Sequence, residues 1–162
     1  MQHGRTLILG LGNPILGDDG IGIAIARAVK ENCSAVSGLD VIEASLGGTF
    51  LLDVIRGYKT VIVADAIMTN EKAPAGSIYR LTVDDLGDIA KPYASHALDL
   101  KTTVELGKRL GYDMPGTILI YAVEIKENMT FREGLSPTIE AAIMPVARRI
   151  MEELNTSAIG HP

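Results

Sequence analysis

Asp19, Asp65 and His96 are the residues of this sequence whose types and positions could support metal binding or hydrolysis. Asp19 comes after a glycine-rich turn, Asp65 follows the apolar run Thr60–Ala64, and His96 begins a helical pattern after a short polar stretch. Two carboxylates and one imidazole form a mixed oxygen and nitrogen ligand set. Such a set suits a borderline or hard divalent ion and leaves coordination positions open.

Each of these residues also has a structural explanation. Asp18 and Asp19 stand at a helix start, where aspartate is favoured as a cap and by the helix dipole, so Asp18 could cap while Asp19 projects outward. Asp65 could hydrogen-bond the loop that follows its strand. The other two of the three histidines lie near the chain ends, so any chemistry that needs an imidazole within the folded body depends on His96.

Other kinds of chemistry fit the sequence less well. The segment Gly10–Gly20 is glycine-rich, but Ile15 occupies the position of the third glycine in a dinucleotide fingerprint, and no Walker lysine follows. No G-x-S-x-G nucleophile elbow occurs. Cys33 falls at the end of the first predicted helix and is interpreted as structural. The turn Gly47–Thr49 would either let the backbone approach a ligand closely or simply reverse the chain.

Alternating apolar runs and helical patterns predict how these residues are positioned. The strands are expected at Thr6–Leu11, Leu39–Ala44, Thr60–Ala64, Ser77–Thr82 and Thr117–Val123, and the helices at Asp18–Glu31, Thr49–Ile55, His96–Leu110 and from Pro137 onward. This alternation predicts one domain over residues 1–162, with a core from about residue 5 to residue 154. The expected fold is a three-layer α/β/α sandwich with a mainly parallel central sheet and an antiparallel edge strand at Ser77–Thr82.

The site of such a sheet lies at the carboxyl ends of its strands, where the strand order reverses. The first and third strands are commonly neighbours at that point, so Asp19 and Asp65 are expected to face each other. In the last helix, Ser136 is the predicted N-cap and Pro137 the first helical residue. Pro145 should kink this helix, because proline lacks the N–H and crowds the preceding turn. The residues after Asn155 are expected to fray.

Composition and charge narrow the possible functions. Hydrophobic residues make up 47% and charged residues 22%, as in globular proteins. The net charge is −5, only 4% of residues are aromatic and no basic cluster occurs, which disfavours nucleic-acid binding. No apolar run approaches the roughly 18 residues needed to span a bilayer, and no signal peptide is evident. We expect a cytoplasmic monomer that does not insert into membranes.

The motifs around these residues resemble those of the hydrogenase maturation endopeptidases, which remove the C-terminal extension of nickel-iron hydrogenase large subunits. The opening LILGLGNPILGDDGIG is similar to the family's strand, G-x-G-N turn and acidic residue before a glycine-rich helix start. VIVADAI is similar to its strand that ends in aspartate, SHALDL to its histidine at a helix start, and GLSPTIEAAI to the entrance of its last helix. The similarity covers nearly the whole chain.

The resemblance implies an endopeptidase that makes one cut in a precursor whose nickel is already in place. Asp19, at a position where the family accepts Glu or Asp, would then join Asp65 and His96 as catalytic residues and as ligands of the substrate's nickel. Another divalent cation could occupy the site in isolation. A metal-polarised water or carbonyl and carboxylate-assisted general base catalysis both remain open as the route of attack.

Two alternatives remain at this stage. LGLGNP also resembles the start of peptidyl-tRNA hydrolases, but those enzymes would need a histidine soon after the first strand, and none occurs between Asn13 and His96. A non-enzymatic nickel chaperone or sensor could use the same three ligands. Cleavage of a nickel-loaded precursor would separate an endopeptidase from both alternatives.

Overall fold

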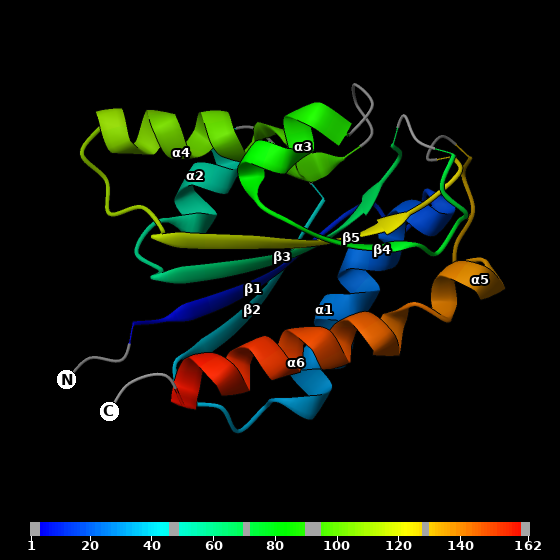
Figure 1. The fold of residues 1–162 in the computed structure, drawn as a ribbon, viewed down its shortest axis with the longest axis horizontal. Helices are drawn as coiled ribbons and strands as arrows, with labels where there is room; N and C mark the ends of the chain where they lie inside the picture. Colours follow the sequence, from blue (N-terminus) through cyan, green and yellow to red (C-terminus); the bar gives the residue numbers. More distant parts are fainter. Residues whose placement is uncertain (1–3, 46–48, 70–71, 90–94, 128–129, 160–162) are drawn as a thin grey trace.

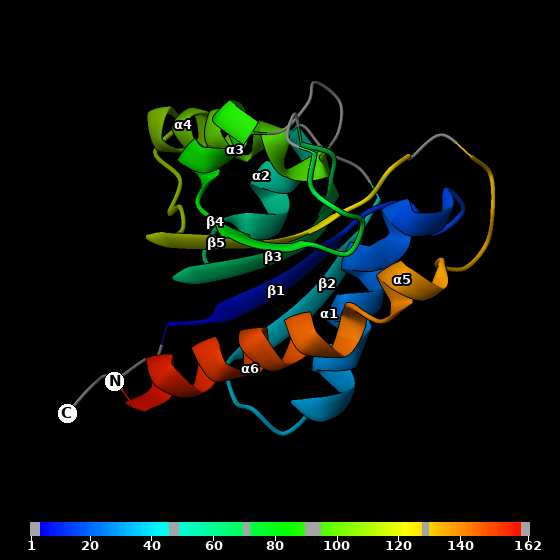
Figure 2. The ribbon, with the colours of Figure 1, turned by 45° about the vertical axis from the view of Figure 1, so that its right-hand side comes forward.

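The computed structural model describes residues 4–45, 49–69, 72–89, 95–127 and 130–159. Within them a central sheet lies between two layers of helices, as Figures 1 and 2 show from two sides. The predicted three-layer α/β/α architecture is therefore confirmed. The glycines of the predicted turn at residues 47–48, and the histidines at positions 3 and 161, lie outside the described residues.

The sheet has five strands in the order β2-β1-β3-β5-β4. In chain order the strands are β1 Thr6–Leu11, β2 Leu39–Ala44, β3 Thr60–Ile67, β4 Ile78–Leu81 and β5 Thr117–Glu124. All neighbouring strands are parallel except β4, which pairs antiparallel with β5 at the edge of the sheet. The mainly parallel sheet with one antiparallel edge strand was predicted, as was the adjacency of the first and third strands.

The helices divide between the two faces of the sheet. They are η1 Gly17–Gly20, α1 Ile21–Asn32, α2 Thr49–Ile55, α3 Val83–Ile89, η2 His96–Asp99, α4 Leu100–Arg109, α5 Pro137–Glu140 and α6 Ile143–Ile159, where η marks a 3-10 helix. Figure 1 shows α1, α5 and α6 on one face and α2, α3 and α4 on the other. Alternating residues of the buried strands supply the two cores: Ile62 and Ala64 of β3 pack on the α1 and α6 side, and Val61 and Val63 on the opposite side.

Two expectations about the helices were wrong in detail. The helix α3 was not predicted, because its sequence VDDLGDI is short and only Leu86 of it is buried. The last helix was expected to fray after Asn155, but α6 continues to Ile159. The predicted kink is an interruption at residues 141 and 142. Pro145 accounts for it, since proline cannot donate to the carbonyl of Ala141 and its ring crowds that position.

The glycines after β1 allow close packing of α1 against the sheet. A Cβ atom on Gly22 would lie 2.1 Å from the carbonyl oxygen of Leu11 and 2.3 Å from that of Ala64. Gly12 has a φ of +144°, and a Cβ there would lie 2.1 Å from the carbonyl oxygen of Asp19. These glycines are therefore explained by packing at the start of α1, consistent with the rejection of a nucleotide-binding loop. Among the described residues, no helix has the length and apolarity to cross a membrane.

Candidate functional site

The candidate site lies where the strand order reverses, between β1 and β3. The last β1–β3 residue pair joins Gly10 to Ala64, so Asp65 is the first residue of β3 beyond its β1 partner. Asp65 was predicted to follow the last residue of its strand, and this was wrong, because β3 continues to Ile67 alongside β5. Its side chain is fully buried, and it follows Val61 and Val63 in alternation, so it points to the face that carries η2 and α4.

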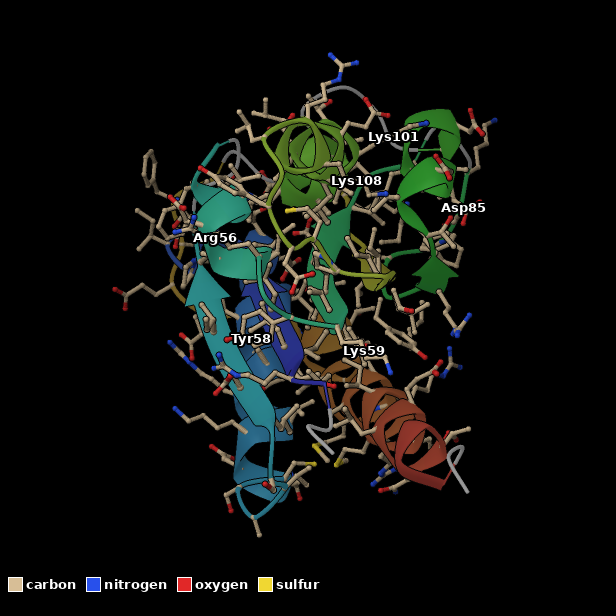
Figure 3. All side chains as sticks on the ribbon, turned by 90° about the vertical axis from the view of Figure 1, so that its left-hand side faces the viewer. Arg56, Tyr58, Lys59, Asp85, Lys101 and Lys108 are labelled. Carbon is tan, nitrogen blue, oxygen red and sulfur yellow. The ribbon has the colours of Figure 1, made fainter. Side chains whose placement is uncertain are left out.

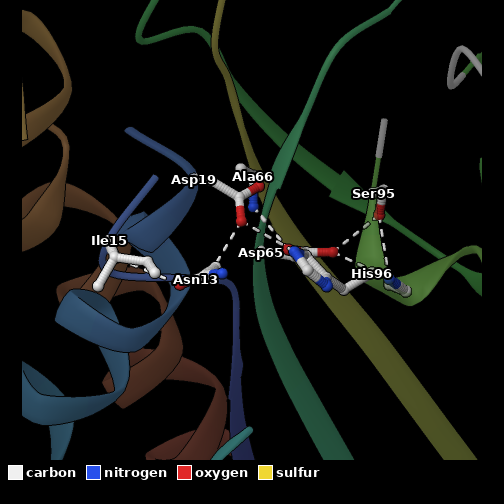
Figure 4. Close-up of polar contacts among 8 residues, drawn as sticks. Asn13, Ile15, Asp19, Asp65, Ala66, Ser95 and His96 are labelled. Carbon is white, nitrogen blue, oxygen red and sulfur yellow. Dashed lines mark hydrogen bonds and ion pairs between the residues drawn. The ribbon is translucent and has the colours of Figure 1, made fainter. Parts of the chain in front are cut away.

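Asp19 reaches the same place from the opposite face of the sheet. It belongs to η1, which leads into α1, and only 4% of its surface is exposed. Its Oδ2 accepts a hydrogen bond of 2.9 Å from the backbone N–H of Asn13 and lies 2.9 Å from Nε2 of His96. The loop therefore turns back on itself and fixes the carboxylate toward the histidine (Figure 4).

His96 is held by Asp65 through the residues on both sides of it. Asp65 Oδ2 accepts hydrogen bonds from the Ser95 hydroxyl at 2.8 Å and from the backbone N–H of Ala97 at 2.9 Å. The Ser95 hydroxyl also accepts a hydrogen bond from the Ala97 N–H. Ser95 is thereby the N-cap of η2, whose first residue is His96. Figure 4 shows Asp19, Asp65 and His96 in one cluster, so the structure brings the three predicted residues together.

Burial and charge alter the proton affinities of two of these groups. Burial raises the pKa of Asp65 to about 6, while His96, Ser95 and the Ala97 amide oppose that rise. The pKa of His96 is raised, mainly because its ring hydrogen-bonds Asp19 and despite its partial burial. A carboxyl group and an imidazole whose pKa values are both raised by their surroundings are common features of catalytic sites.

The cluster is not a closed metal cage. No group of three His, Cys, Asp or Glu side chains within the described part of the chain is arranged to hold a metal ion. The reason lies in the contacts. The imidazole Nε2 faces Asp19, and both oxygens of Asp65 already accept hydrogen bonds, Oδ1 from the Ala66 N–H. The donor set still fits a divalent ion chemically, provided that the ion replaces the proton between Asp19 and His96.

Asp18 does not cap its own helix, contrary to the expectation. Its Oδ1 accepts from the backbone N–H of Ser136 at 2.6 Å, and its Oδ2 accepts from the Ser136 hydroxyl at 2.9 Å. Arg132 approaches the same carboxylate at 3.4 Å. Asp18 therefore links the start of α5 to the loop on which Asp19 lies. The short η1 has no side-chain cap of its own.

Sequence reasoning missed the role of Ser95 and placed Cys33 correctly. Ser95 entered the prediction only as the first letter of the motif SHALDL, although a serine immediately before a helix start is a typical N-cap and could have been recognised as one. Cys33 is the C-cap residue of α1, carries a free thiol and packs against the core below the sheet, as its structural interpretation requires.

Comparison with known proteins places this geometry in a family context. Residues 23–153 match the family model described as hydrogenase maturation protease. The hydrogenase 2 maturation protease of Escherichia coli K12 is 27% identical over 156 residues, which cover 96% of this chain and 93% of that protein.

Solved structures agree with the sequence comparison. The hydrogenase maturating endopeptidase HybD from Escherichia coli superposes with a TM-score of 0.79 at 27% identity, over 94% of this chain and 93% of that one. The nickel-iron hydrogenase maturation protease HybD from Thermococcus kodakarensis has a TM-score of 0.68 at 26% identity, over 93% and 98% of the two chains. The fold and the chain length are thus shared across nearly the whole molecule.

Proposed function

The chain belongs to the hydrogenase maturation protease family, whose members are endopeptidases, and on that premise we propose that Asp19, Asp65 and His96 recognise the nickel of a hydrogenase large-subunit precursor. The reaction is removal of the precursor's C-terminal extension after nickel insertion. The nickel is part of the substrate and not a resident cofactor. All three residues come from one chain, so a monomer suffices for the site.

The single observation that carries the proposal is the contact between Asp19 and His96 at the reversal point of the sheet. A carboxylate and an imidazole 2.9 Å apart share a proton that a divalent metal can replace. The pair is partly open to solvent, with 25% of the His96 side chain exposed. A metal that arrives with ligands of its own needs only such an incomplete set from the protease.

Asp65 contributes in two ways in this proposal. Its Oδ2 anchors Ser95 and Ala97 and so fixes the ring of His96 between them. Within the described part of the chain its Oδ1 accepts only the N–H of the adjacent Ala66, and it is the oxygen we assign to the metal. The hydrolytic step adds water to the scissile carbonyl, breaks the C–N bond and leaves a new carboxylate and a new amine, with a carboxylate of the site assisting removal of the water proton.

Cleavage of matched precursors tests the proposal. A purified nickel-iron hydrogenase large-subunit precursor is incubated with the protein in nickel-loaded and nickel-free forms, and release of the C-terminal extension is measured by mass spectrometry. We expect a cut in the nickel-loaded precursor alone. Equal cutting of both forms would contradict recognition of nickel, and binding of the loaded precursor with no cut would favour a chaperone or sensor.

A further inference from the structure

Both phenylalanines of this chain lie on its surface. Phe131 is 80% exposed and Phe50 is 48% exposed, although phenylalanine is among the residues most often buried. Phe131 belongs to the loop between β5 and α5, and it is the more exposed of the two. A protein with only 4% aromatic residues and no tryptophan therefore keeps its most exposed phenyl ring at the carboxyl edge of the sheet, where the candidate site lies.

Phe131 has a second exposed apolar residue beside it. Residues 16 and 132 form a short parallel bridge, in which the N–H of Arg132 donates to the carbonyl of Ile15 at 2.9 Å and the N–H of Gly17 donates to the carbonyl of Arg132 at 2.7 Å. Ile15 and Phe131 each precede the bridged pair by one residue, so their backbones run side by side. Ile15 is 50% exposed. We call these two residues the apolar rim.

The rim is fixed in place and connected to the catalytic loop. Asp18 accepts both hydrogen bonds of Ser136, which ties the end of the Phe131 loop to η1. On the other side, the N–H of Ile15 donates to the side-chain oxygen of Asn13 at 3.2 Å. The N–H of Asn13 donates in turn to Asp19. Figure 4 shows Ile15 and Asn13 on the side of Asp19 that is away from Ser95.

We propose that the apolar rim of Ile15 and Phe131 docks an apolar side chain of the precursor's peptide, independently of the nickel. This inference rests on the proposed function, since an endopeptidase must hold a stretch of its substrate on one side of the reacting groups. Ile15 lies on the same loop as Asp19, and the bridge between residues 16 and 132 holds Phe131 beside it, so the rim adjoins the segment that carries a reacting group. Fixed exposed apolar groups bind with little loss of conformational entropy, which suits them to this task.

Binding of the nickel-free precursor tests the rim without relying on cleavage. Its affinity is measured by biolayer interferometry on the wild-type protein and on Phe131→Ser, Phe131→Leu and Leu110→Ser. Leu110 is 55% exposed and follows α4 at the opposite edge of the sheet, so Leu110→Ser removes comparable apolar surface away from the rim. We expect Phe131→Ser to weaken binding by about tenfold, as loss of a buried ring would. The affinity of Phe131→Leu should be close to that of the wild type, and the affinity of Leu110→Ser should equal that of the wild type.

The outcomes separate this inference from the proposed function. Equal affinities of wild type and Phe131→Ser, with the variant folded by circular dichroism, would overturn the rim, as would equal weakening by Leu110→Ser. Failure of the wild type to bind the nickel-free precursor would also overturn it, because the rim is nickel-independent. Failure of the wild type to cut the nickel-loaded precursor would instead overturn the proposed function and leave the binding result standing.

Discussion

An aspartate lies at each end of the parallel strands of the central sheet, and the two aspartates have opposite environments. We call these ends the amino edge and the carboxyl edge. At the amino edge, seen in Figure 3, Tyr58 donates to Asp40 at 3.0 Å and Arg5 pairs with the same carboxylate, which is 39% exposed. At the carboxyl edge, Asp65 is fully buried, and its hydrogen-bond partners are the Ser95 hydroxyl and two backbone amides, with His96 acting on it electrostatically. An exposed ion pair contributes little to stability, whereas a buried carboxylate without a cation costs stability and gains reactivity.

Among substitutions of single aspartates at the two edges, replacement of Asp19 by asparagine should give the largest loss of activity. The Asp19→Asn variant keeps the shape of the side chain. It loses the negative charge that faces His96 and, in our proposal, the metal. We expect cleavage of the nickel-loaded precursor to fall by at least about a hundredfold in kcat/KM. The measurement is the initial rate of extension release, with Asp40→Asn at the amino edge as the matched control. Similar activity of the two variants would remove the distinction between the edges.

Asp65→Asn should change how the free energy of unfolding depends on pH, and so reveal what the buried carboxyl group costs in stability. The pKa of Asp65 is raised from 3.8 to about 6 in the folded protein, so the folded state holds a proton that the unfolded state has released between these values. Its contribution to stability is therefore lost as pH rises from about 4 to about 6. Relative to the wild type, Asp65→Asn should gain about 3 kcal/mol of unfolding free energy across this window.

The check is urea unfolding of wild type, Asp65→Asn and Asp40→Asn from pH 4 to pH 7. Asp40→Asn is the control, because Asp40 is a partly exposed partner of Arg5 at the amino edge. If the stability of Asp65→Asn followed the same pH dependence as that of the wild type, burial would not perturb this carboxyl group.

Asp18→Ala should have an intermediate effect, mainly on stability. It removes both acceptors of Ser136, and loss of such hydrogen bonds to a charged group costs about 1–2 kcal/mol. We expect the KM for precursor to rise several-fold, since the rim loses its fixed position, while kcat changes little. Asp18→Asn should be milder, because the amide oxygen still accepts from the Ser136 N–H. Loss of kcat in Asp18→Ala equal to that in Asp19→Asn would contradict the separate roles of the two aspartates.

Chelator treatment should have the smallest effect. The core on both faces of the sheet consists of apolar side chains, and the described residues contain no closed cage of metal ligands. The melting temperature in the presence of a chelator should therefore stay within about one degree of the untreated protein. A drop of many degrees on chelation would reveal a structural metal in the fold. Differential scanning calorimetry of the same preparation with and without chelator decides between these results.

Part of the carboxyl edge could be predicted from the sequence, and part could not. The strand over Thr60–Ala64 and the position of His96 at a helix start follow from apolar runs and local patterns, although β3 extends further, to Ile67. The reversal rule for parallel sheets then predicted that Asp19 and Asp65 face each other. The partner of Asp18 could not be predicted, because Ser136 is 118 residues away and local capping explained the aspartate equally well. The hydrogen bonds that Asp65 makes on both sides of His96 likewise depend on tertiary contact.

The most direct test of the proposed nickel recognition by Asp19, Asp65 and His96 is cleavage by His96→Ala. This substitution removes the only interior imidazole of the described residues and breaks the 2.9 Å contact with Asp19, while the Ser95 cap and the Ala97 amide that hold the start of η2 remain. The measurement is extension release from the nickel-loaded precursor, with circular dichroism to verify the fold. The account predicts a folded protein that makes no cut. Full cleavage by folded His96→Ala would contradict it.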